Sequence, residues 1–501
     1  MNGSSQSVDV ALCFDVEDIF SEPEVGNDDS IRELATILHE ERLRGNFLFI
    51  GDRALQLRSR GRQDVIDSLA PHEVGLHTRS ARHPTSPEYV AGKCWQEAVD
   101  LCLQHEREGA EIIGDVFGKP CTALSTHNNF DSPHSQRAAG ILGLPYVYCF
   151  PAAPPLCTLS WYAGALGLPY PMPDVQRRAY FEFRDTWYHP SPGNKSDTPF
   201  QLGMRQLDTH LDLCLDENQP FLTLFLFHPQ RLRLVDFIDW HWSPNGVNYP
   251  KGLWGHFGSP RRRSSEEVET ALGNFRRLAQ FLREDQRVNV ITMSEVKERY
   301  GRQPESITRE ELIFAAKEIS TSSEILIHAS FSPAEMLVGM AHAVREAEAK
   351  GALPREVPRK DVLGPLNSPI WIPELQACDA ARLAKLAGEL IGHVESTGHL
   401  PATLGAPLER VGANHLYGAF AGYVLEASIG NSPSEIRFRR MPPWPALASQ
   451  IGIAFMKQAE ADTVDPDIDV NTLYRDGKLQ TWTLKPATLP GCASTKGNRA
   501  Q

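Results

Sequence analysis

The sequence predicts an α/β fold over its first 304 residues, in the form of a (β/α) barrel, followed by a mainly α-helical C-terminal region. Two observations lead to this prediction. Short apolar runs alternate with longer segments of helical spacing through roughly the first 300 residues, which is typical of a parallel sheet, closed or open. From Ile307 onward the apolar runs give way to helices with capped starts. A chain of 501 residues is also long for a single domain.

The predicted strands are short runs rich in apolar residues, as expected where a sheet is covered on both faces. They alternate with segments in which apolar residues recur at helical spacing. In chain order the strands are 8–14, 45–51, 72–77, 144–150 and 220–228, and the helices are 31–42, 62–70, 93–113 and 266–283. Residues 288–296 are a closing strand followed by the start of a helix. In a barrel of such units, the chemistry would lie at the C-terminal ends of the strands.

The C-terminal region contains two pairs of helices with the same layout: a helix, a short β-like turn and a second helix. We interpret this as a weak internal duplication of a small helical module. The predicted segments are a barrel domain at 1–304, a helical module at 305–352, a proline-rich connector at 353–376, a second helical module at 377–430 and an irregular extension at 431–501 whose end is disordered.

The charge balance argues against two classes of partner. Acidic residues outnumber basic ones by 63 to 50, for a net charge of -13. Binding to nucleic acid or to an anionic membrane surface needs clustered Lys and Arg, so neither partner is expected. The nine cysteines include no CxxC pair, which excludes a cysteine-rich zinc site or a disulfide scaffold. No signal peptide or membrane span is visible in the sequence, so a cytoplasmic location is expected.

An acidic cluster follows the first predicted strand. In the segment FDVED, Asp15, Glu17 and Asp18 place three carboxylates within four residues. Like charges this close destabilise a fold unless a cation compensates for them. The end of a strand in an α/β fold is also where metal-binding and basic carboxylates lie. A metal or catalytic site and a solvated acidic turn are both consistent with this pattern.

Three histidines follow other predicted strands. His77 and His83 lie after the third strand with five residues between them, a spacing that paired zinc histidines use. They would lie on different faces of a regular helix, so only a turn could bring them together. His228 ends the most apolar strand. Each histidine alone is consistent with a structural role, but acids and histidines at several strand ends would converge at the mouth of one barrel.

Together these motifs resemble the polysaccharide deacetylase (NodB-homology) family. FDVED, the segment His77–Pro84 and FLFHP occur in the family's order, and GNFLFIG, EVGLH and TMSEVKERYG are similar to its framework strands and closing helix. The resemblance covers roughly Val8–Gly301 and implies a distorted (β/α) barrel of about seven strands with its site at the strand ends. It also implies hydrolysis of acetyl groups on glycans, or of other C–N bonds. The family uses one divalent metal ion, usually zinc, held by an acid and two histidines.

The resemblance implies a role for each motif residue. Asp15 matches the family's general base, and Glu17 matches a metal-binding acid, with Asp18 as the alternative ligand. His77 matches the first metal histidine, and His228 matches the general acid that protonates the leaving amine. These roles are chemically consistent, because a metal polarises the acetyl carbonyl and acidifies water, a carboxylate accepts a proton and an imidazole returns one.

Two positions depart from the family pattern. The second metal histidine normally lies four residues after the first, where this chain has Ala81, so His83 is the candidate substitute. The third motif should fall near Leu124–Pro133, where this chain reads LSTHNNFDSP. Candidate oxyanion or substrate contacts in this segment are His127, Asn128 and Asn129. The leading prediction is a metal-dependent hydrolase that removes acetyl groups from an acetylated sugar or related amide. The alternative is a catalytically degenerate barrel that binds a glycan or a protein.

An aromatic segment and the C-terminal modules indicate a carbohydrate partner. Trp187, in FRDTWYHP, could stack on a sugar ring in a cleft, or it could be an ordinary core residue. HVESTGHLPATL and the helix after it resemble a pseudomurein-binding repeat, and residues 307–344 are similar to another copy. That resemblance implies contact with a cell-envelope polysaccharide. The alternative is a packing module that stabilises the barrel or a homodimer.

Overall fold

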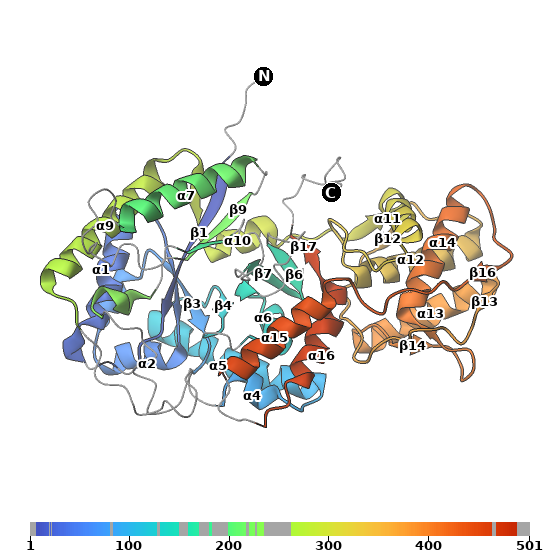
Figure 1. Cartoon of the computed structure of the whole chain (residues 1–501), viewed down its shortest axis with the longest axis horizontal. Helices are drawn as coiled ribbons and strands as arrows, with labels where there is room; N and C mark the ends of the chain where they lie inside the picture. Colours follow the sequence, from blue (N-terminus) through green and yellow to red (C-terminus); the bar gives the residue numbers. More distant parts are fainter. Residues whose placement is uncertain are drawn as a thin grey trace, which may run out of the picture. The chain divides into compact units, whose positions relative to one another are not determined.

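The chain forms two compact units. The computed structural model describes residues 7–19, 21, 23–80, 84–127, 131–149, 159–169, 180–182, 199–216, 220–225, 228–234, 262–462 and 467–487. Unit 1 comprises Met1–Leu159, Ala165–Arg299 and Lys457–Val470, and unit 2 comprises Ser160–Gly164, Tyr300–Met456 and Asn471–Gln501. Each unit is therefore built from three separate segments of the chain (Figure 1).

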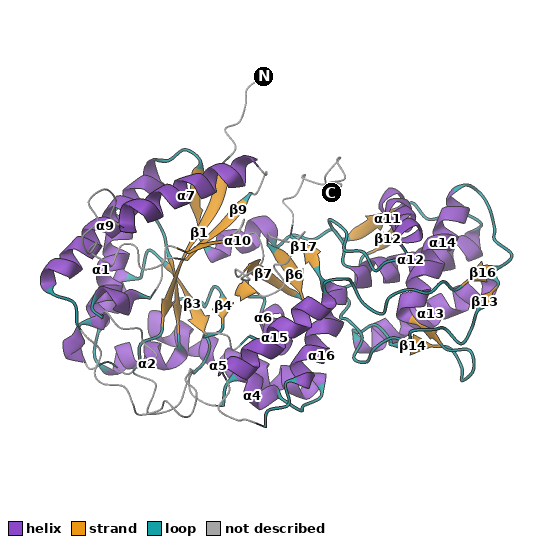
Figure 2. Ribbon diagram, viewed as in Figure 1, coloured by secondary structure: helices purple, strands orange, loops and turns teal. Residues whose placement is uncertain are grey.

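Unit 1 contains a curled parallel sheet, to which its described residues contribute nine strands (Figure 2). The strand order is β7-β5-β4-β3-β2-β1-β9-β8, and β10 also pairs with β1. In chain order the strands are β1 (Val8–Val16), β2 (Asn46–Phe49), β3 (Glu73–His77), β4 (Leu124–Ser125), β5 (Tyr146–Cys149), β7 (Ala165–Pro169), β8 (Tyr180–Glu182), β9 (Phe221–Phe225) and β10 (Val288–Ile291).

Strand β1 is the centre of this sheet. Its first half pairs with β10, its second half pairs with β2, and β9 pairs along its other side. All nine of its residues are buried, which agrees with the apolar run predicted for a strand covered on both faces. The ring of Phe14 stacks on that of Phe47 in β2 at a centroid distance of 4.6 Å. This contact packs β1 against β2.

Helices surround the strands of unit 1 (Figure 2). In the described residues, no helix of the chain combines the length and the apolar character that crossing a bilayer requires. The helices of unit 1 are η1 (Pro23–Val25), α1 (Asn27–Glu40), α2 (Gly51–Ser59), α3 (Gln63–Ser68), α4 (Ser86–Val90), α5 (Trp95–Phe117), α6 (Pro133–Leu142), α7 (Pro199–Asp216), η2 (Pro229–Leu232), α9 (Ser265–Glu284) and α10 (Met293–Tyr300).

The predicted alternation of strands and helices is confirmed, but the predicted number of about seven strands is wrong. Three strands were not predicted from the sequence: β4, β7 and β8. They have two, five and three residues, and β4 and β8 are too short to show a periodic pattern. In the described residues, β7 and β8, the outermost strands that unit 1 contributes, are not paired with each other, so these strands do not close into a barrel.

Unit 2 is mainly helical, with three two-stranded sheets that pair β11 with β12, β13 with β16, and β14 with β15. A further short pair joins β6 to β17. Its elements are β6 (Ser160–Tyr162), β11 (Ser306–Thr308), α11 (Arg309–Ser322), α12 (Pro333–Lys350), β12 (Glu356–Pro358), β13 (Ala377–Cys378), α13 (Ala380–Thr397), β14 (Thr403–Leu404), β15 (Val411–Gly412), α14 (Ala413–Ser428), β16 (Ile436–Arg437), α16 (Asn471–Leu479), η5 (Gln480–Thr483) and β17 (Lys485–Pro486). Helix α15 (Ala448–Asp462) begins in unit 2, and its residues from Lys457 onward belong to unit 1.

The C-terminal extension, predicted to be irregular, contains the helices α15 and α16. The core of unit 2 is one apolar cluster that takes residues from α11, α12, α13 and α14 and includes Trp482 of η5. The indole N–H of Trp482 donates to the carbonyl of Pro443 at 3.1 Å. The modular division predicted for 305–352, 353–376 and 377–430 stays a prediction.

A buried histidine joins α1 to the strands of unit 1. His72, immediately before β3, is 3% exposed. Its Nε2 lies 2.9 Å from the carbonyl oxygen of Ala35 in α1, and the backbone N–H of Gly45 donates to its Nδ1 at 3.2 Å. Nε2 therefore carries the hydrogen of a neutral ring. Burial lowers the pKa of His72 to about 4, although the Ala35 carbonyl raises it.

We expect His72 to make the chain acid-sensitive. Because its pKa is lower in the fold than in the unfolded chain, its stabilising effect is complete above about pH 6.5 and is lost as the pH falls toward 4. The loss in unfolding free energy is roughly 3 kcal/mol, at about 1.4 kcal/mol per pKa unit. His72→Asn keeps an acceptor for Gly45 but does not titrate. Urea denaturation from pH 7 to pH 4 should show a smaller loss for this variant, and identical pH profiles would contradict the assignment.

Candidate functional site

Four strands of unit 1 bring acids and histidines to one edge of the sheet. Asp15 lies in β1, and Glu17 follows the end of that strand. His77 ends β3, and His127 comes two residues after β4. His228 comes three residues after β9. Because these strands are parallel, their carboxyl ends lie at the same edge of the sheet.

Glu17 is at the centre of this group. Its Oε2 lies 2.5 Å from His127 Nδ1 and 3.3 Å from His77 Nε2, and its Oε1 lies 2.5 Å from His228 Nε2. The Glu17 side chain is only 1% exposed. A carboxylate buried to this extent is destabilising unless cationic or hydrogen-bonding partners surround it, and the three imidazoles supply those partners.

The environment fixes the charge states of this group. Burial raises the pKa of Glu17, but the charges and hydrogen bonds of His228 and His127 outweigh burial and hold it well below its usual range. Burial lowers the pKa of His228, but the Glu17 carboxylate outweighs it and the pKa rises. For His127 burial is the stronger effect and lowers the pKa to about 4. At neutral pH Glu17 is therefore an anion and His127 a neutral imidazole, which are the forms that bind metal ions.

Ser125 orients the imidazole of His77. The two residues are paired across strands β3 and β4, and Ser125 Oγ lies 2.5 Å from His77 Nδ1. This contact leaves His77 Nε2 facing the carboxylates, 3.3 Å from Glu17 Oε2 and 3.8 Å from Asp15 Oδ2. A hydrogen bond to the second ring nitrogen is the usual way in which proteins orient a metal-binding histidine.

Glu17, His77 and His127 fit a divalent cation. Each offers one ligand atom, and these atoms all lie within 4.8 Å of one another. Zinc ligands at ~2.0–2.2 Å in a tetrahedron are ~3.3 Å apart, so small side-chain movements would close this group around an ion. Two imidazoles and one carboxylate form a ligand set that catalytic zinc uses. All three residues are buried, which keeps solvent from competing for the ligand positions.

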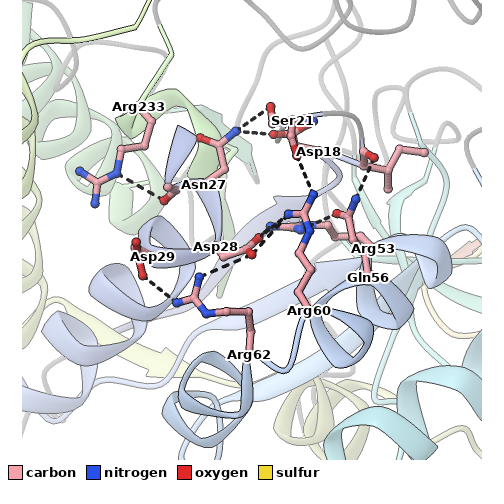
Figure 3. Close-up of polar contacts among 12 residues, drawn as sticks. Asp18, Ser21, Asn27, Asp28, Asp29, Arg53, Gln56, Arg60, Arg62 and Arg233 are labelled. Carbon is pink, nitrogen blue, oxygen red and sulfur yellow. Dashed lines mark hydrogen bonds and ion pairs between the residues drawn. The ribbon is translucent and has the colours of Figure 1, made fainter. Parts of the chain in front are cut away.

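Asp18, the alternative ligand in the sequence analysis, is held elsewhere. Its Oδ1 accepts a hydrogen bond from the backbone N–H of Ser21 at 3.1 Å, and its Oδ2 accepts one from the side-chain amide of Asn27 (Figure 3). The structure therefore brings Glu17 to the histidines and holds Asp18 against the start of α1. Asp15, the candidate base, is 5% exposed and lies at the edge of the ligand group.

His127 is the residue whose position the sequence analysis missed. It was predicted as an oxyanion or substrate contact, a role that stays a prediction, and the structure places it against Glu17. The available signal was a histidine shortly after a strand, as for His77, but the strand before His127 has only two residues. Four other predicted residues lie outside the described residues, namely His83, Asn128, Asn129 and Trp187.

Gln56 of α2 and Arg60, the residue that follows α2, contact the backbone of residues after Glu17. The Gln56 side-chain amide donates to the carbonyl of Ile19 at 3.0 Å, and Arg60 Nη2 donates to the carbonyl of Ser21 at 2.7 Å (Figure 3). These side chains satisfy the backbone oxygens of Ile19 and Ser21.

A buried ion-pair network continues this frame at the start of α1. Asp28 is paired with Arg53, and Arg60 Nη1 lies 3.2 Å from the same carboxylate (Figure 3). The side chains of Asp28 and Arg53 are 1% and 2% exposed. Burial raises the pKa of Asp28, but Arg53 and Arg60 outweigh burial and lower it. The network thus joins α1, through Asp28, to α2, through Arg53.

Comparisons with known proteins give structural similarities alone. No protein-family model and no curated protein matches the chain. A crystal structure named as a polysaccharide deacetylase of Mycobacterium smegmatis aligns at 14% identity and a TM-score of 0.37, covering 59% of this chain and 91% of that one. One from Pseudomonas aeruginosa PAO1 aligns at 10% identity and 0.36, covering 58% and 90%. A CE4 family pseudoenzyme from Bacillus anthracis aligns at 11% and 0.26, covering 45% and 56%. At these values the alignments assign no activity, and the side chains of the site carry the functional argument.

The Asp28 network should be important for stability. Asp28→Asn leaves the buried Arg53 without its counter-ion, and we expect a loss of about 3–5 kcal/mol in unfolding free energy. Asp64→Asn is the matched control, because Asp64 pairs with Arg62 at 2.8 Å but its side chain is 43% exposed, so a loss below about 1 kcal/mol is expected. Urea denaturation at pH 7 measures both variants. Equal losses would show that burial does not govern this network.

Proposed function

We propose that this chain is a metal-dependent hydrolase that removes acetyl groups from an acetylated sugar or a related amide. The observation that carries the proposal is the buried group of Glu17, His77 and His127 at the carboxyl ends of parallel strands, with Asp15 and His228 beside it. The sequence resemblance to polysaccharide deacetylases supports the same chemistry.

Glu17, His77 and His127 would hold one divalent ion, for which zinc is our proposal. When bound, the ion would polarise the acetyl carbonyl and lower the pKa of a water molecule. His83 remains the alternative to His127 as the second histidine. The position of His127 supports its role, because its Nδ1 and His77 Nε2 both face Glu17 Oε2. His127 would thereby supply the imidazole that the family pattern would have at position 81.

Asp15 and His228 would move the protons. Hydrolysis adds water across the C–N bond, with the hydroxyl going to the carbonyl carbon and a proton to the leaving nitrogen. Asp15, at the edge of the ligand group, would accept the proton of the attacking water. His228 would deliver a proton to the amine as the bond breaks. The products are acetate and a free amine.

The two oxygens of Glu17 have different partners, which supports two separate roles for this carboxylate. Oε2 faces His77 and His127, while Oε1 faces His228 Nε2. The ring of His228 also packs edge-on against Phe225 at a centroid distance of 5.8 Å. Glu17 would thus orient the proton donor while it binds the ion.

Further parts of the chain would select the substrate. Asn128, Asn129 and Trp187 stay proposed substrate contacts, with amide donors for an oxyanion and an aromatic face for a sugar ring. The helical modules of unit 2 would contact a cell-envelope polysaccharide, or would serve in packing within a homodimer. A catalytically degenerate barrel is the rival function, and Ala81 in place of a family histidine is the observation that favours it.

Zinc titration tests the metal site. We expect the purified chain to bind one equivalent of zinc, and His127→Ala to weaken binding by at least tenfold because one of three ligands is lost. His83→Ala should leave the affinity unchanged, as should the control His39→Ala, which alters an exposed histidine of α1. Isothermal titration calorimetry at pH 7.5 measures all four proteins. A large loss in His83→Ala with none in His127→Ala would restore His83 as the ligand.

Acetate release tests the reaction. The zinc-loaded chain should release acetate from members of a panel of N-acetylated sugars and amides. Asp15→Asn should lower the rate by about 10²–10⁴-fold, because the base is lost, while zinc affinity changes much less. An enzyme-coupled acetate assay follows the rate, and His39→Ala is the control. A chain that binds zinc and sugar but releases no acetate would support the degenerate binding module.

A further inference from the structure

The residue after His77 has a strained backbone. Thr78 has a φ of 64°, in the left-handed region that β-branched residues rarely adopt. Such a conformation persists only where surrounding contacts enforce it. Because Thr78 is bonded to a proposed metal ligand, its backbone angles set the direction of the chain that leaves His77.

Backbone hydrogen bonds fix Thr78 on two sides. Its N–H donates to the carbonyl of Ser125 at 2.9 Å, and its carbonyl accepts from the N–H of Gly51 at 3.1 Å. Gly51 allows this approach, because a Cβ at that position would lie 2.7 Å from the carbonyl oxygen of Arg79. The turn is therefore held between the last residue of β4 and the first residue of α2.

The third side of Thr78 faces a buried carboxyl group on α5. Thr78 Oγ1 donates to Glu106 Oε1 at 3.4 Å, and Glu106 is 1% exposed. Helix α5 lies unusually close to the turn at Gly109, where a Cβ would be 2.6 Å from a Leu76 methyl and 3.2 Å from Arg79 Cα. Gly109 is one helical turn after Glu106, so it allows the short reach from α5 to Thr78.

Glu106 has no place in the proposed reaction, yet it is buried at a cost. Burial raises the pKa of Glu106 to about 7, although hydrogen bonds from the Arg79 backbone and the Thr78 hydroxyl lower it. A buried carboxyl group is retained in a core only where its hydrogen bonds matter. Its hydrogen-bond partners include the hydroxyl of Thr78, the strained residue beside His77, and the backbone of Arg79 next to it.

We propose that Glu106 is a positioning residue that holds Thr78 in its left-handed conformation and thereby directs the His77 imidazole toward Glu17. This inference rests on the proposed metal site. Helix α5 supplies none of Glu17, His77 and His127. Through Glu106 it would nevertheless affect the affinity for the metal ion.

The test is a zinc titration of a double-mutant cycle. Glu106→Ala should weaken zinc binding about tenfold, the lower end of the effect of outer partners of metal ligands. Glu106→Gln keeps an acceptor oxygen and should stay within about twofold of the wild type. Thr78→Gly adopts a positive φ without strain, so adding Glu106→Ala to it should cost no further affinity. A general loss of core packing would not be rescued by this glycine.

Glu108→Ala is the matched control. Glu108 also lies on α5 and pairs with the same turn, but it binds Arg79, at 2.9 Å, and its side chain is 55% exposed. It should bind zinc as the wild type does. If Glu106→Ala does not fold, Thr78→Val removes the same hydrogen bond and should show the same tenfold loss.

Crystal structures of the variants give a readout that is independent of metal. In Glu106→Ala, residue 78 should leave the left-handed region or the His77 ring should turn from Glu17. Wild-type zinc affinity in Glu106→Ala, or equal losses with and without Thr78→Gly, would overturn the positioning role while the metal site itself stands. A wild-type chain that binds no zinc would instead overturn the proposed function.

Discussion

The burial of one carboxylate, that of Glu17, is the constraint on which the site depends. An anion with 1% exposure is tolerated only if partners replace its water, and here three histidines from three different strand ends do so. The same requirement explains why these strands must end together. A shift of any one of them would leave either the carboxylate or an imidazole unpaired. The side chains proposed to bind the metal ion therefore also contribute to the stability of the fold.

Around this anion, each group is oriented from outside the site. Ser125 contacts the ring of His77, while Gln56 of α2 and Arg60, which caps that helix, bind the carbonyls of Ile19 and Ser21 after Glu17. The Asp28 network fixes the start of α1. These contacts come from helices and strands, not from long loops, so the precision of the site derives from elements that pack in the core. The geometry is consequently a property of unit 1 as a whole.

The sequence predicted the parts of this arrangement that depend on local pattern. Apolar runs located β1, β3 and β9, and therefore the ends where Asp15, His77 and His228 lie. The family's acid-x-acid pattern pointed to Glu17 as the metal-binding acid, and in the structure Asp18 instead accepts a hydrogen bond from Asn27. The contact between His127 and Glu17 spans 110 residues and follows a two-residue strand, so no local pattern could reveal it. The contact between Thr78 and Glu106 likewise depends on how closely α5 packs.

The interleaving of the two units along the chain affects how the protein can be made. Strand β6 belongs to unit 2 and pairs with β17, which is separated from it by more than 300 residues, and residues 457–470 return to unit 1. A ribosome must therefore synthesise nearly the whole chain before either unit has all its segments. Loop closure over such distances is slow, and both units pass through a period with incomplete cores. A chain divided near residue 300 would give two polypeptides, and neither would contain all the segments of one unit. The two units must therefore be made together, even though each has its own core.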